Sequence, residues 1–306
     1  MPDAPEVIRA LAERRATARD AHDYATADAL RGEIVAAGWT VVDEPGGWRL
    51  EAAPPAVPHR VGAGAVASVL DEPATSDVTL SWVMEGWPED VARSIASFRD
   101  AADRRTIQFV IADVTGEPAT RWGEDVEVVA LQAGTGWAAA RNAGLRRSRG
   151  RIVLALDGSV EAAGDVIGPL ETALADPEVG LCGPFGLVTD DLHEFRRVAA
   201  AGECDAVEGY LMACTRETLA RVGGFDERFT WYRSADLEWS FRVRDAGLHL
   251  MMVPAPVQVH EHRMWELLAP EQREDRSRRN FSRFLDRWRD RWDLTVRGRP
   301  PDPEAG

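Results

Sequence analysis

Cysteine, long apolar runs and positive charge are all scarce in this sequence. Its 306 residues include three cysteines, Cys182, Cys204 and Cys214. An odd number without a C-x-x-C spacing argues against a disulfide framework and against a zinc site built from cysteines. We therefore expect three reduced, buried thiols.

Long hydrophobic segments are missing at the start of the chain and further along it. The opening stretch MPDAPEVIRALAERR carries acids and arginines where a secretory signal needs a basic end followed by unbroken apolar residues. No later run is long enough to cross a bilayer. These absences predict a cytoplasmic protein.

Basic residues are outnumbered by acidic ones, 36 to 51, which gives a formal net charge of -15. The long-range field of such a chain repels polyanions, so a nucleic acid is not favoured as the main partner. A local basic patch is compatible with this balance.

The first pattern in the chain is helical. Apolar residues recur at helical spacing in two stretches within residues 7–37, and Gly38 stops the pattern. Two short strands then flank the turn Glu-Pro-Gly-Gly. We predict a small helical-hairpin module over residues 1–50. A linker should follow over residues 51–76, where Ala, Pro, Gly and Val show no clear period.

Strands and helices alternate from Asp77 onward. This alternation implies crossover connections, and therefore an α/β fold with a mostly parallel sheet covered by helices on both faces. The predicted strands cover residues 78–84, 107–112, 126–131 and 151–156. Ligands of such sheets bind beyond the carboxyl ends of the strands. The candidate binding residues are those that follow the strands: Met84, Glu85, Asp113 and Asp157.

The segment ERRATARDAHDYATADALRGEIVAAGWTVVDEPGGWRL, residues 13–50, resembles the small C-terminal module of cysteinyl-tRNA synthetases. In that module a helical pair with the sense A-R-x-x-K-D-F-A-x-A-D-x-(I/L)-R precedes G-(I/W)-x-V-x-D-x-x-x-G. Nothing of a synthetase catalytic domain accompanies it here. The resemblance implies an accessory packing or interaction module, with tRNA contact as the less favoured alternative.

Further stretches carry a second resemblance, in this order: VTLSWVMEGWPEDVARSIASF, QFVIADVTGEP, GWAAARNAGLRRSRGRIVLALDGS and GYLMACTRETLARVGGFDERFTWYRSADLEWSFRVRDAGLHLMMVPAPVQVHEH. Residues 77–265 are similar to family 2 glycosyltransferases, with a rhamnosyltransferase-like pattern. The resemblance implies the GT-A fold, a Rossmann-like sheet. It also implies inverting transfer of a sugar from a nucleotide diphosphate sugar to an acceptor that the sequence does not identify: a glycan, a lipid-linked molecule or a small molecule.

The resemblance assigns roles on the donor side. Asp113 would accept a hydrogen bond from the nucleotide base, and Asp157 would contact the ribose or a divalent cation, Mg²⁺ or Mn²⁺, that bridges the phosphates. Each Asp also reads as a turn former after a strand, so a structural role stays open for both. Arg141 and Asn142 could face the diphosphate, although an exposed arginine on an arginine-rich helix is an equal alternative.

Ser159 breaks the family pattern. A second Asp usually stands at this position as a direct metal ligand, and a hydroxyl is a poor substitute for a carboxylate. The D-x-D is therefore degenerate and the cation is in doubt, while Ser159, Met84 and Glu85 stay candidates for contact with the donor. Glu161 is a weak replacement, because in an extended chain it lies about 13 Å from Asp157.

A histidine near the end of the resemblance is the remaining candidate metal ligand. His260 in PVQVHEH matches the family's late histidine. The resemblance therefore implies that His260 and Asp157 hold a metal ion or contact the phosphates. His262 is the less favoured substitute. A structural histidine at a strand end is the alternative.

The stretch SADLEWSFRVRDAG predicts a helix that opens near Ser234. It resembles the family's E-D-x-D-L-x-x-R, which makes Asp236 the general base and places Glu238 and Arg242 on the acceptor side. An acid in the first turn of a helix is also favoured by the helix dipole. Ala235 stands where an acid normally precedes the base. Ser159 and Ala235 keep open a non-catalytic relative that binds a nucleotide or acts as a scaffold.

An amphipathic helix is predicted over residues 266–296. Its apolar stripe contains Phe281, Phe284, Leu285, Trp288 and Trp292, and seven arginines lie between residues 276 and 291. The helix would either lie peripherally on the inner face of the membrane near a lipid-linked acceptor or, as we favour, pack on the catalytic domain. Residues 297–306, rich in Pro and acids, are expected to be a disordered tail.

Overall fold

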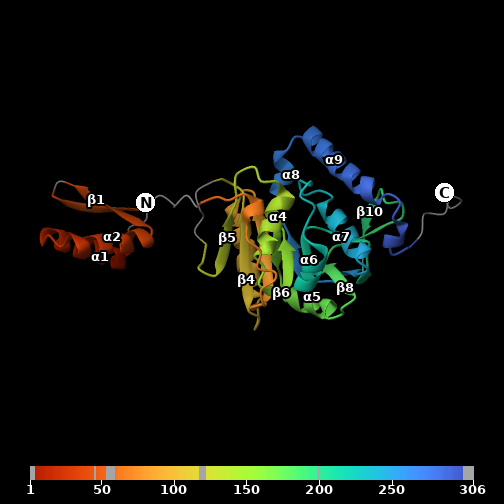
Figure 1. The fold of residues 1–306 in the computed structure, drawn as a ribbon, viewed down its shortest axis with the longest axis horizontal. Coiled ribbons are helices and arrows are strands. Elements are labelled where there is room, and N and C mark those ends of the chain that lie inside the picture. The colour runs from red at the N-terminus through yellow and green to blue at the C-terminus, as the bar shows by residue number, and fades with distance from the viewer. Residues whose placement is uncertain (1–3, 45, 53–58, 117–121, 199, 299–306) are drawn as a thin grey trace. The chain divides into compact units, whose positions relative to one another are not determined.

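The computed structural model describes residues 4–44, 46–52, 59–116, 122–198 and 200–298. The chain divides into two compact units, one of residues 1–58 and 117–121 and one of residues 59–116 and 122–306 (Figure 1). Each unit has a hydrophobic core of its own.

The small unit is a pair of helices and a hairpin. Helices α1 (Glu6–Asp20) and α2 (Tyr24–Ala36) precede the antiparallel strands β1 (Trp39–Glu44) and β2 (Gly47–Ala52). Apolar side chains from α1, α2 and β1 form its own core. Arg15 is buried and donates to both carboxylate oxygens of Asp43, at 2.9 and 3.0 Å. This contact ties α1 to the hairpin, and the predicted helical-hairpin module is confirmed.

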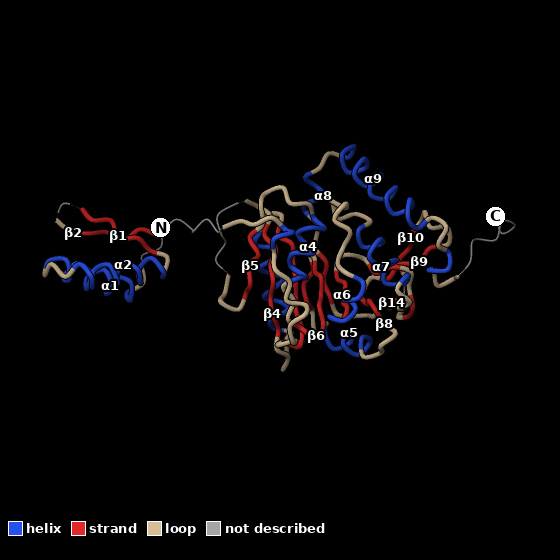
Figure 2. The backbone as a smooth tube through the Cα atoms, in the orientation of Figure 1, coloured by secondary structure: helices blue, strands red, loops and turns tan. Residues whose placement is uncertain are grey.

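The large unit is built on an eight-stranded sheet of order β11-β14-β8-β13-β6-β3-β4-β5 (Figure 2). Strands β5, β4, β3 and β6 are parallel neighbours, as are β14 and β8, whereas β13 is antiparallel to β6 and β8. The strands are β3 (Ser76–Met84), β4 (Ile107–Asp113), β5 (Val126–Ala130), β6 (Gly150–Leu156), β8 (Val179–Gly183), β11 (Gly202–Glu203), β13 (Leu211–Thr215) and β14 (His249–Met252). The predicted mostly parallel α/β fold is confirmed.

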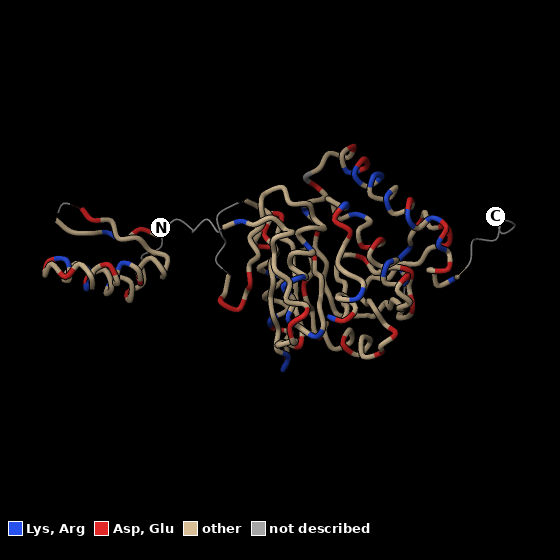
Figure 3. The backbone as a smooth tube through the Cα atoms, in the orientation of Figure 1, with Lys and Arg blue, Asp and Glu red and all other residues tan. Residues whose placement is uncertain are grey.

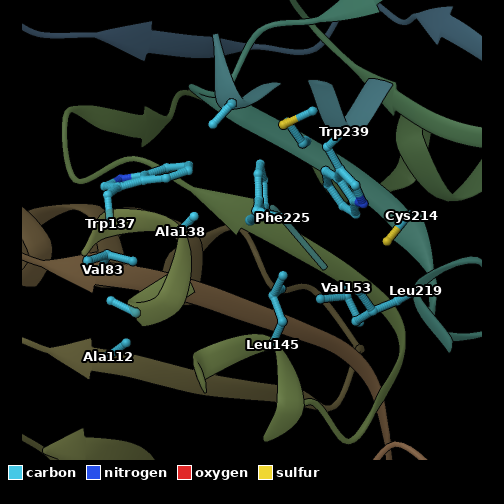
Figure 4. Close-up of a cluster of buried hydrophobic side chains, with 14 of the residues drawn as sticks. Val83, Ala112, Trp137, Ala138, Leu145, Val153, Cys214, Leu219, Phe225 and Trp239 are labelled. Atoms are coloured by element: carbon cyan, nitrogen blue, oxygen red, sulfur yellow. The ribbon is translucent and has the colours of Figure 1, made fainter. Parts of the chain in front are cut away.

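Helices cover both faces of this sheet. Helices α4 (Trp137–Arg146), α6 (Arg216–Val222) and α7 (Ala235–Asp245) contribute to one buried cluster, part of which is drawn in Figure 4. Helices α3 (Pro88–Asp100) and α5 (Ile167–Leu174) contribute to the other. Val83 and Val153 belong to the first cluster, and their neighbours Trp82 and Leu154 belong to the second. The alternation of side chains along a strand therefore fills two cores.

Shorter elements surround the sheet. Strand β7 (Val160–Ala162) pairs with β15 (Val257–Val259), and β9 (Gly186–Thr189) lies between β10 (Phe195–Arg197) and β12 (Ala206–Val207). Helices α8 (Arg263–Leu267) and α9 (Pro270–Trp288) follow the last strand, and single 3-10 turns lie at Ala63–Ala65 and Trp292–Leu294.

The prediction of a linker over residues 51–76 is wrong for most of that stretch. Val61 forms a β-bridge with Leu131, and the side chain of Ala63 is buried. Arg216 of α6 donates to the carbonyls of Val69 and Leu70. The residues of this stretch gave no periodic signal, yet their backbone groups form hydrogen bonds with the rest of the large unit. Residues 53–58 lie outside the described residues.

The apolar stripe of α9 packs on the protein itself. Phe284 and Trp288 are buried in a cluster with Leu187 and Phe241, and Phe281, Leu285 and Trp292 are partly buried against the same cluster. Charged residues of both signs cover the rest of the helix (Figure 3), as in the pairs Arg278–Glu274 and Arg279–Asp275. The predicted amphipathic helix is therefore two helices and a 3-10 turn, and its stripe is not free for a membrane. Among the described residues no helix is long and apolar enough to span one.

The three cysteines are buried and unpaired by disulfides. Burial raises the pKa of Cys214 to about 12. The expectation of reduced, buried thiols agrees with this placement. Residues 299–306 of the predicted disordered tail lie outside the described residues.

Candidate active site

Three parallel strands end at one edge of the sheet. Met84 of β3 pairs with Asp113 of β4, and Trp82 of β3 pairs with Leu156 of β6. Asp157, the residue after β6, lines a cleft of about 510 Å³. Segments distant in sequence complete the lining, among them Tyr210, Tyr232, Arg233, Asp236, His262 and Trp265.

Ser159 holds Asp157 in a tight turn. The backbone N–H and the hydroxyl of Ser159 both donate to Oδ1 of Asp157, at 2.8 and 2.6 Å. Asp157 in turn donates its backbone N–H to the carbonyl of Tyr210, the residue that precedes β13. The neutral residue in the D-x-D position therefore orients the carboxylate that precedes it.

His262 occupies the other oxygen of that carboxylate. Its Nε2 lies 2.9 Å from Oδ2 of Asp157. Burial alone would raise the pKa of Asp157, but the hydrogen bonds from His262 and Ser159 and the charge of His262 hold it at about 2. Burial likewise opposes the charged form of His262, yet the hydrogen bond and charge of Asp157 raise the pKa of this imidazole. Each group therefore favours the charged form of the other.

His260 is not the partner of Asp157. Its Nε2 lies 2.7 Å from Oε1 of Glu161, which also pairs with Arg93. The backbone N–H of His260 donates to the carbonyl of Ser159 at 2.8 Å, because β15 pairs with β7. The geometry therefore places the less favoured histidine, and not His260, at the proposed donor site.

Glu85 follows β3 and lines a smaller hollow of about 50 Å³ with Asp157, Ser159 and His262. Burial and then the charge of Asp157 raise the pKa of Glu85 to about 7. Met84 beside it is 3% exposed and belongs to the core. Of these two strand-end candidates, Glu85 can contact a ligand through its side chain.

Asp113 ends β4 and is closed off by its own neighbours. Its Oδ2 accepts from Arg60 at 3.0 Å, and its Oδ1 accepts from the backbone N–H and the hydroxyl of Thr115 at 2.9 and 2.7 Å. The residue is 2% exposed, and it is not among the residues that line the cleft. The carboxylate makes the turn contacts that the sequence left open, and its contact with a nucleotide base stays a prediction.

Arg141 is buried, so the alternative of an exposed arginine is wrong. Its guanidinium donates to the carbonyls of Ser81 and Leu156, at 2.8 and 2.9 Å, and it is 1% exposed. Burial lowers the pKa of Arg141 to about 10, and the charges of Asp157 and Glu85 oppose that shift. The side chain ties β3 to β6 beneath the site and supplies positive charge from below.

Asn142 holds the loop Gly-Gly-Phe-Asp, residues 223–226, through hydrogen bonds. Its Oδ1 accepts from the backbone N–H of Phe225 at 2.7 Å, and its Nδ2 donates to the carbonyl of Phe225 at 2.8 Å. A Cβ at Gly224 would stand 2.1 Å from Oδ1 of Asn142, so the close approach requires glycine there. The amide is committed to this loop and does not face the cleft.

Asp236 lines the cleft at the start of α7. Its Oδ2 accepts from the backbone N–H of Gly209 and its Oδ1 from that of Leu237, both at 3.0 Å. Burial raises the pKa of Asp236, and these two hydrogen bonds oppose the shift. Ser234, the N-cap residue, has a φ of 63°, a left-handed conformation that is uncommon for serine.

Glu238 and Arg242 lie on the other side of the same helix. The guanidinium of Arg242 donates to both oxygens of Glu238, at 3.0 and 2.9 Å, and Arg287 of α9 donates to Glu238 at 3.1 Å. Glu238 is 2% exposed, and Arg242 also donates to the carbonyls of Val222 and Gly224. These two predicted acceptor-side residues pair with each other, Glu238 buried and Arg242 partly buried, because α7 turns them toward the core and α9.

The sequence prediction missed most of the lining, including Tyr210, Tyr232, Arg233 and Trp265. Two of them stand next to motif positions, because Arg233 precedes Asp236 by one helical turn and Trp265 follows His262 at the same spacing. Tyr232 packs on His262 with ring centroids 4.5 Å apart. Closeness to a motif residue was the signal that could have identified them.

The side chains present do not fit a cation held by the protein. Among the described residues no three His, Cys, Asp or Glu side chains come together as ligands would. Both oxygens of Asp157 already accept hydrogen bonds, and Ser159 adds no carboxylate. Mg²⁺ and Mn²⁺ prefer several oxygen ligands, with carboxylates prominent among them.

Comparisons with known proteins agree with this division of the chain. The family model "Glycosyl transferase family 2" matches residues 88–239, and "Cysteinyl-tRNA ligase anticodon binding domain" matches residues 1–49. A cysteine-tRNA ligase of Opitutus terrae is 53% identical over 51 residues, which cover 17% of this chain and 11% of the ligase.

The large unit is similar in fold to the solved structure of GalNAc-T7. The structure of GalNAc-T7 with UDP, GalNAc and Mn²⁺ superposes with a TM-score of 0.57 at 17% identity, over 71% of this chain and 50% of that one. A mannosyltransferase of Pyrobaculum calidifontis with GDP-Man and Mn²⁺ gives a TM-score of 0.45 at 21% identity, over 62% of this chain and 57% of the other. The chain thus spans about half the length of the GalNAc-T7 structure.

The family match covers the strands and helices that carry Asp113, Asp157 and Asp236, and the likeness of fold extends around them. The chain therefore carries a glycosyl transferase family 2 domain with the GT-A fold, preceded by a segment similar to the anticodon-binding domain of cysteinyl-tRNA ligases.

Proposed function

We propose that the large unit transfers a sugar from a nucleotide diphosphate sugar to an acceptor hydroxyl with inversion at the anomeric carbon. One observation carries the proposal. Asp157, after β6, and Asp236, at the start of α7, line the same cleft of about 510 Å³. A donor-side carboxylate and a candidate base are thereby brought to one space of the size that small-molecule ligands occupy.

Asp236 is the proposed general base. In a single displacement, its carboxylate accepts the proton of the acceptor hydroxyl while that oxygen bonds to the anomeric carbon. The nucleotide diphosphate leaves with the electron pair of the broken bond. Backbone amides of Gly209 and Leu237 fix the carboxylate without neutralising it. Burial raises the pKa of Asp236 toward the range in which a base works efficiently near neutral pH.

Asp157 and Glu85 are proposed to face the donor. Asp157 keeps its charge because its pKa is held at about 2, and Ser159 fixes its orientation. The structure of GalNAc-T7 contains UDP, GalNAc and Mn²⁺, which supports a nucleotide sugar as the donor class. The acceptor would approach from the part of the cleft lined by Leu187, Phe195 and Tyr210, which offers apolar and aromatic surface.

A panel of nucleotide sugars tests this proposal. Thermal unfolding is followed with UDP, GDP and dTDP sugars, with and without Mn²⁺, on the unaltered chain, Asp157→Ala and Asp236→Asn. We expect one donor class to raise the unfolding temperature, Asp157→Ala to lose that shift, and Asp236→Asn to keep it. Turnover, or slow hydrolysis of the donor, should be lost in Asp236→Asn. No donor binding under any condition would defeat the proposal.

A binding protein without catalysis is the second candidate. Ser159 and Ala235 replace two acids of the family pattern, and Glu238 and Arg242 are used up in a buried ion pair. Two results together would favour this candidate. A donor would stabilise the chain without being hydrolysed or transferred, and Asp236→Asn would behave as the unaltered chain does.

For the small unit we propose a protein-interaction role. Residues 1–52 contain ten acidic residues and six arginines, a balance that weakens contact with RNA. Val7 and Tyr24 are exposed to 70% and 60% on its helices, and apolar surface of this kind suits a protein partner. A filter-binding measurement in which total tRNA binds this chain tightly at physiological salt would overturn the proposal.

A further inference from the structure

A diphosphate leaving group requires positive charge, and most of the positive charge in the cleft is neutralised within the protein. Arg197 is ion-paired with Glu208, with Nε 3.0 Å from each carboxylate oxygen. His262 is paired with Asp157 at 2.9 Å. Arg233 also lines the cleft, and within the described part of the chain its side chain makes neither an ion pair nor a hydrogen bond. Arg233 is thus the arginine of the cleft that is available to a ligand.

The main chain of Arg233 is fixed by α9. Asn280, which is 3% exposed, donates from Nδ2 to the carbonyls of Trp231 and Arg233, each at 2.8 Å. Arg283 in turn donates to Oδ1 of Asn280 at 2.9 Å. A buried side-chain amide therefore sets the loop that precedes Asp236.

The guanidinium of Arg233 is also held. Its central carbon lies 5.2 Å from the ring centroid of Trp265, and that ring stacks on Trp231 with centroids 6.1 Å apart and planes 10° apart. Arg273 of α9 lies 5.0 Å from the same Trp265 ring. Cation–π contacts of this kind restrict an arginine before a ligand arrives, which lowers the entropy lost on binding.

The same cleft does not fit a protein-held divalent cation, the usual source of positive charge at a diphosphate. Asp157 has both oxygens occupied by Ser159 and His262. An ion bound there would have to displace contacts that hold the turn together. A guanidinium, by contrast, needs no carboxylate ligands and pairs with phosphate oxygens through two parallel hydrogen bonds.

We propose that Arg233 binds the diphosphate of the donor directly and that nucleotide binding requires no divalent cation. The inference rests on the proposed function above and adds to it a residue and a mode of donor binding. As the bond between the sugar and the diphosphate breaks, negative charge grows on the leaving oxygen, and a guanidinium fixed beside it stabilises that charge. Arg233 would then be a catalytic residue, positioned by Asn280 and Trp265.

Calorimetric titration tests the inference. The full chain is titrated with UDP, GDP and dTDP, once in EDTA and once in Mn²⁺. The corresponding nucleosides serve as probes without phosphate. The variants are Arg233→Gln, Arg233→Lys and, as a matched control, Arg276→Gln, which removes an exposed arginine of α9. Melting curves without nucleotide verify that Arg233→Gln folds as the unaltered chain does.

We expect one diphosphate to bind in EDTA about as tightly as in Mn²⁺. Arg233→Gln should lower the affinity for that diphosphate by about tenfold or more, the range for a lost charge-assisted hydrogen bond. The affinity for the corresponding nucleoside should stay unchanged. Arg233→Lys should recover part of the loss, and Arg276→Gln should bind as the unaltered chain does.

Two results would overturn the inference while leaving the proposed function intact. One is a diphosphate that binds in Mn²⁺ only. The other is Arg233→Gln with undiminished diphosphate affinity, or with nucleoside and diphosphate weakened equally. Failure of every nucleotide to bind in both buffers would instead defeat the proposed function and the inference together.

Discussion

Two carboxylates that lie two residues apart on α7 have different environments. Asp236 lines the cleft and accepts hydrogen bonds from backbone amides alone. Glu238 is 2% exposed and is held by Arg242 and Arg287. Both match acids of a family pattern, yet the turn of a helix sends one toward a ligand and the other into an ion pair. A motif match assigns residue types, and the local surroundings assign their roles.

Removal of the base should have the largest effect. Asp236→Asn keeps an oxygen for one backbone amide but cannot accept a proton, so turnover should fall by about a hundredfold to ten-thousandfold. The other backbone amide loses its acceptor, so the free energy of unfolding should fall by about 1 to 3 kcal/mol. Rate measurements with a saturating donor, beside urea unfolding of both proteins, separate these effects. A variant that unfolds more easily and loses no turnover would give Asp236 the structural role.

Glu238 should show the reverse pattern. Glu238→Gln leaves Arg242 and Arg287 without a buried counter-charge, which should lower the free energy of unfolding by about 3 kcal/mol. The matched control is Glu274→Gln on α9, whose exposed pair with Arg278 should contribute less than about 1 kcal/mol. Urea unfolding measures both. If Glu238→Gln were as stable as the unaltered chain and lost acceptor affinity, Glu238 would belong to the acceptor site after all.

The pH profile of turnover should report Asp236. Only the ionised carboxylate acts as a base, so kcat/KM should fall about tenfold per pH unit below its pKa. Because burial raises that pKa above 3.8, the fall should begin at a higher pH than for an ordinary Asp. Glu85, whose pKa is raised to about 7, is the competing source of such a limb. A profile of Glu85→Gln with the acid limb gone would assign it to Glu85 and contradict the assignment to Asp236.

The smallest effect should come from Asn280. Asn280→Ala leaves the carbonyls of Trp231 and Arg233 without their donor, at a cost of about 1 to 3 kcal/mol in stability. If α9 positions the cleft loop, nucleotide affinity should fall a few-fold, less than in Arg233→Gln. Calorimetry and urea unfolding measure the two quantities. Equal nucleotide affinity in a destabilised Asn280→Ala would confine this residue to packing.

Much of the fold was predictable because periodicity reports burial. The alternation of strand and helix patterns predicted the mostly parallel sheet, and the two-strand turn predicted the hairpin of the small unit. Periodicity did not predict that residues 59–75 pack on the large unit. They have no periodic apolar face, and carbonyl groups such as those of Val69 and Leu70 make contacts with that unit.

The candidate site was predictable only in part. Asp157 and Asp236 stand in motifs and do share a cleft, whereas Asp113 is closed by Arg60, a residue in a stretch that gave no signal. The two histidines of HEH are two residues apart, so a continuous strand would turn both to the same side. Strand β15 ends at Val259, and the path of the chain beyond it brings His262, and not His260, to Asp157.

By itself the sequence determined the class of the fold, the helical-hairpin segment ahead of it, and the residue types available for chemistry. These follow from local patterns, because side-chain spacing along a strand or helix is fixed by backbone geometry. The tertiary structure decided which of those residues meet. It set His262 on Asp157, turned Glu238 and Arg242 into the core, and brought Asn280 and Trp265 from the end of the chain to Arg233. Such contacts join segments far apart in sequence, and only the packing of whole elements determines them.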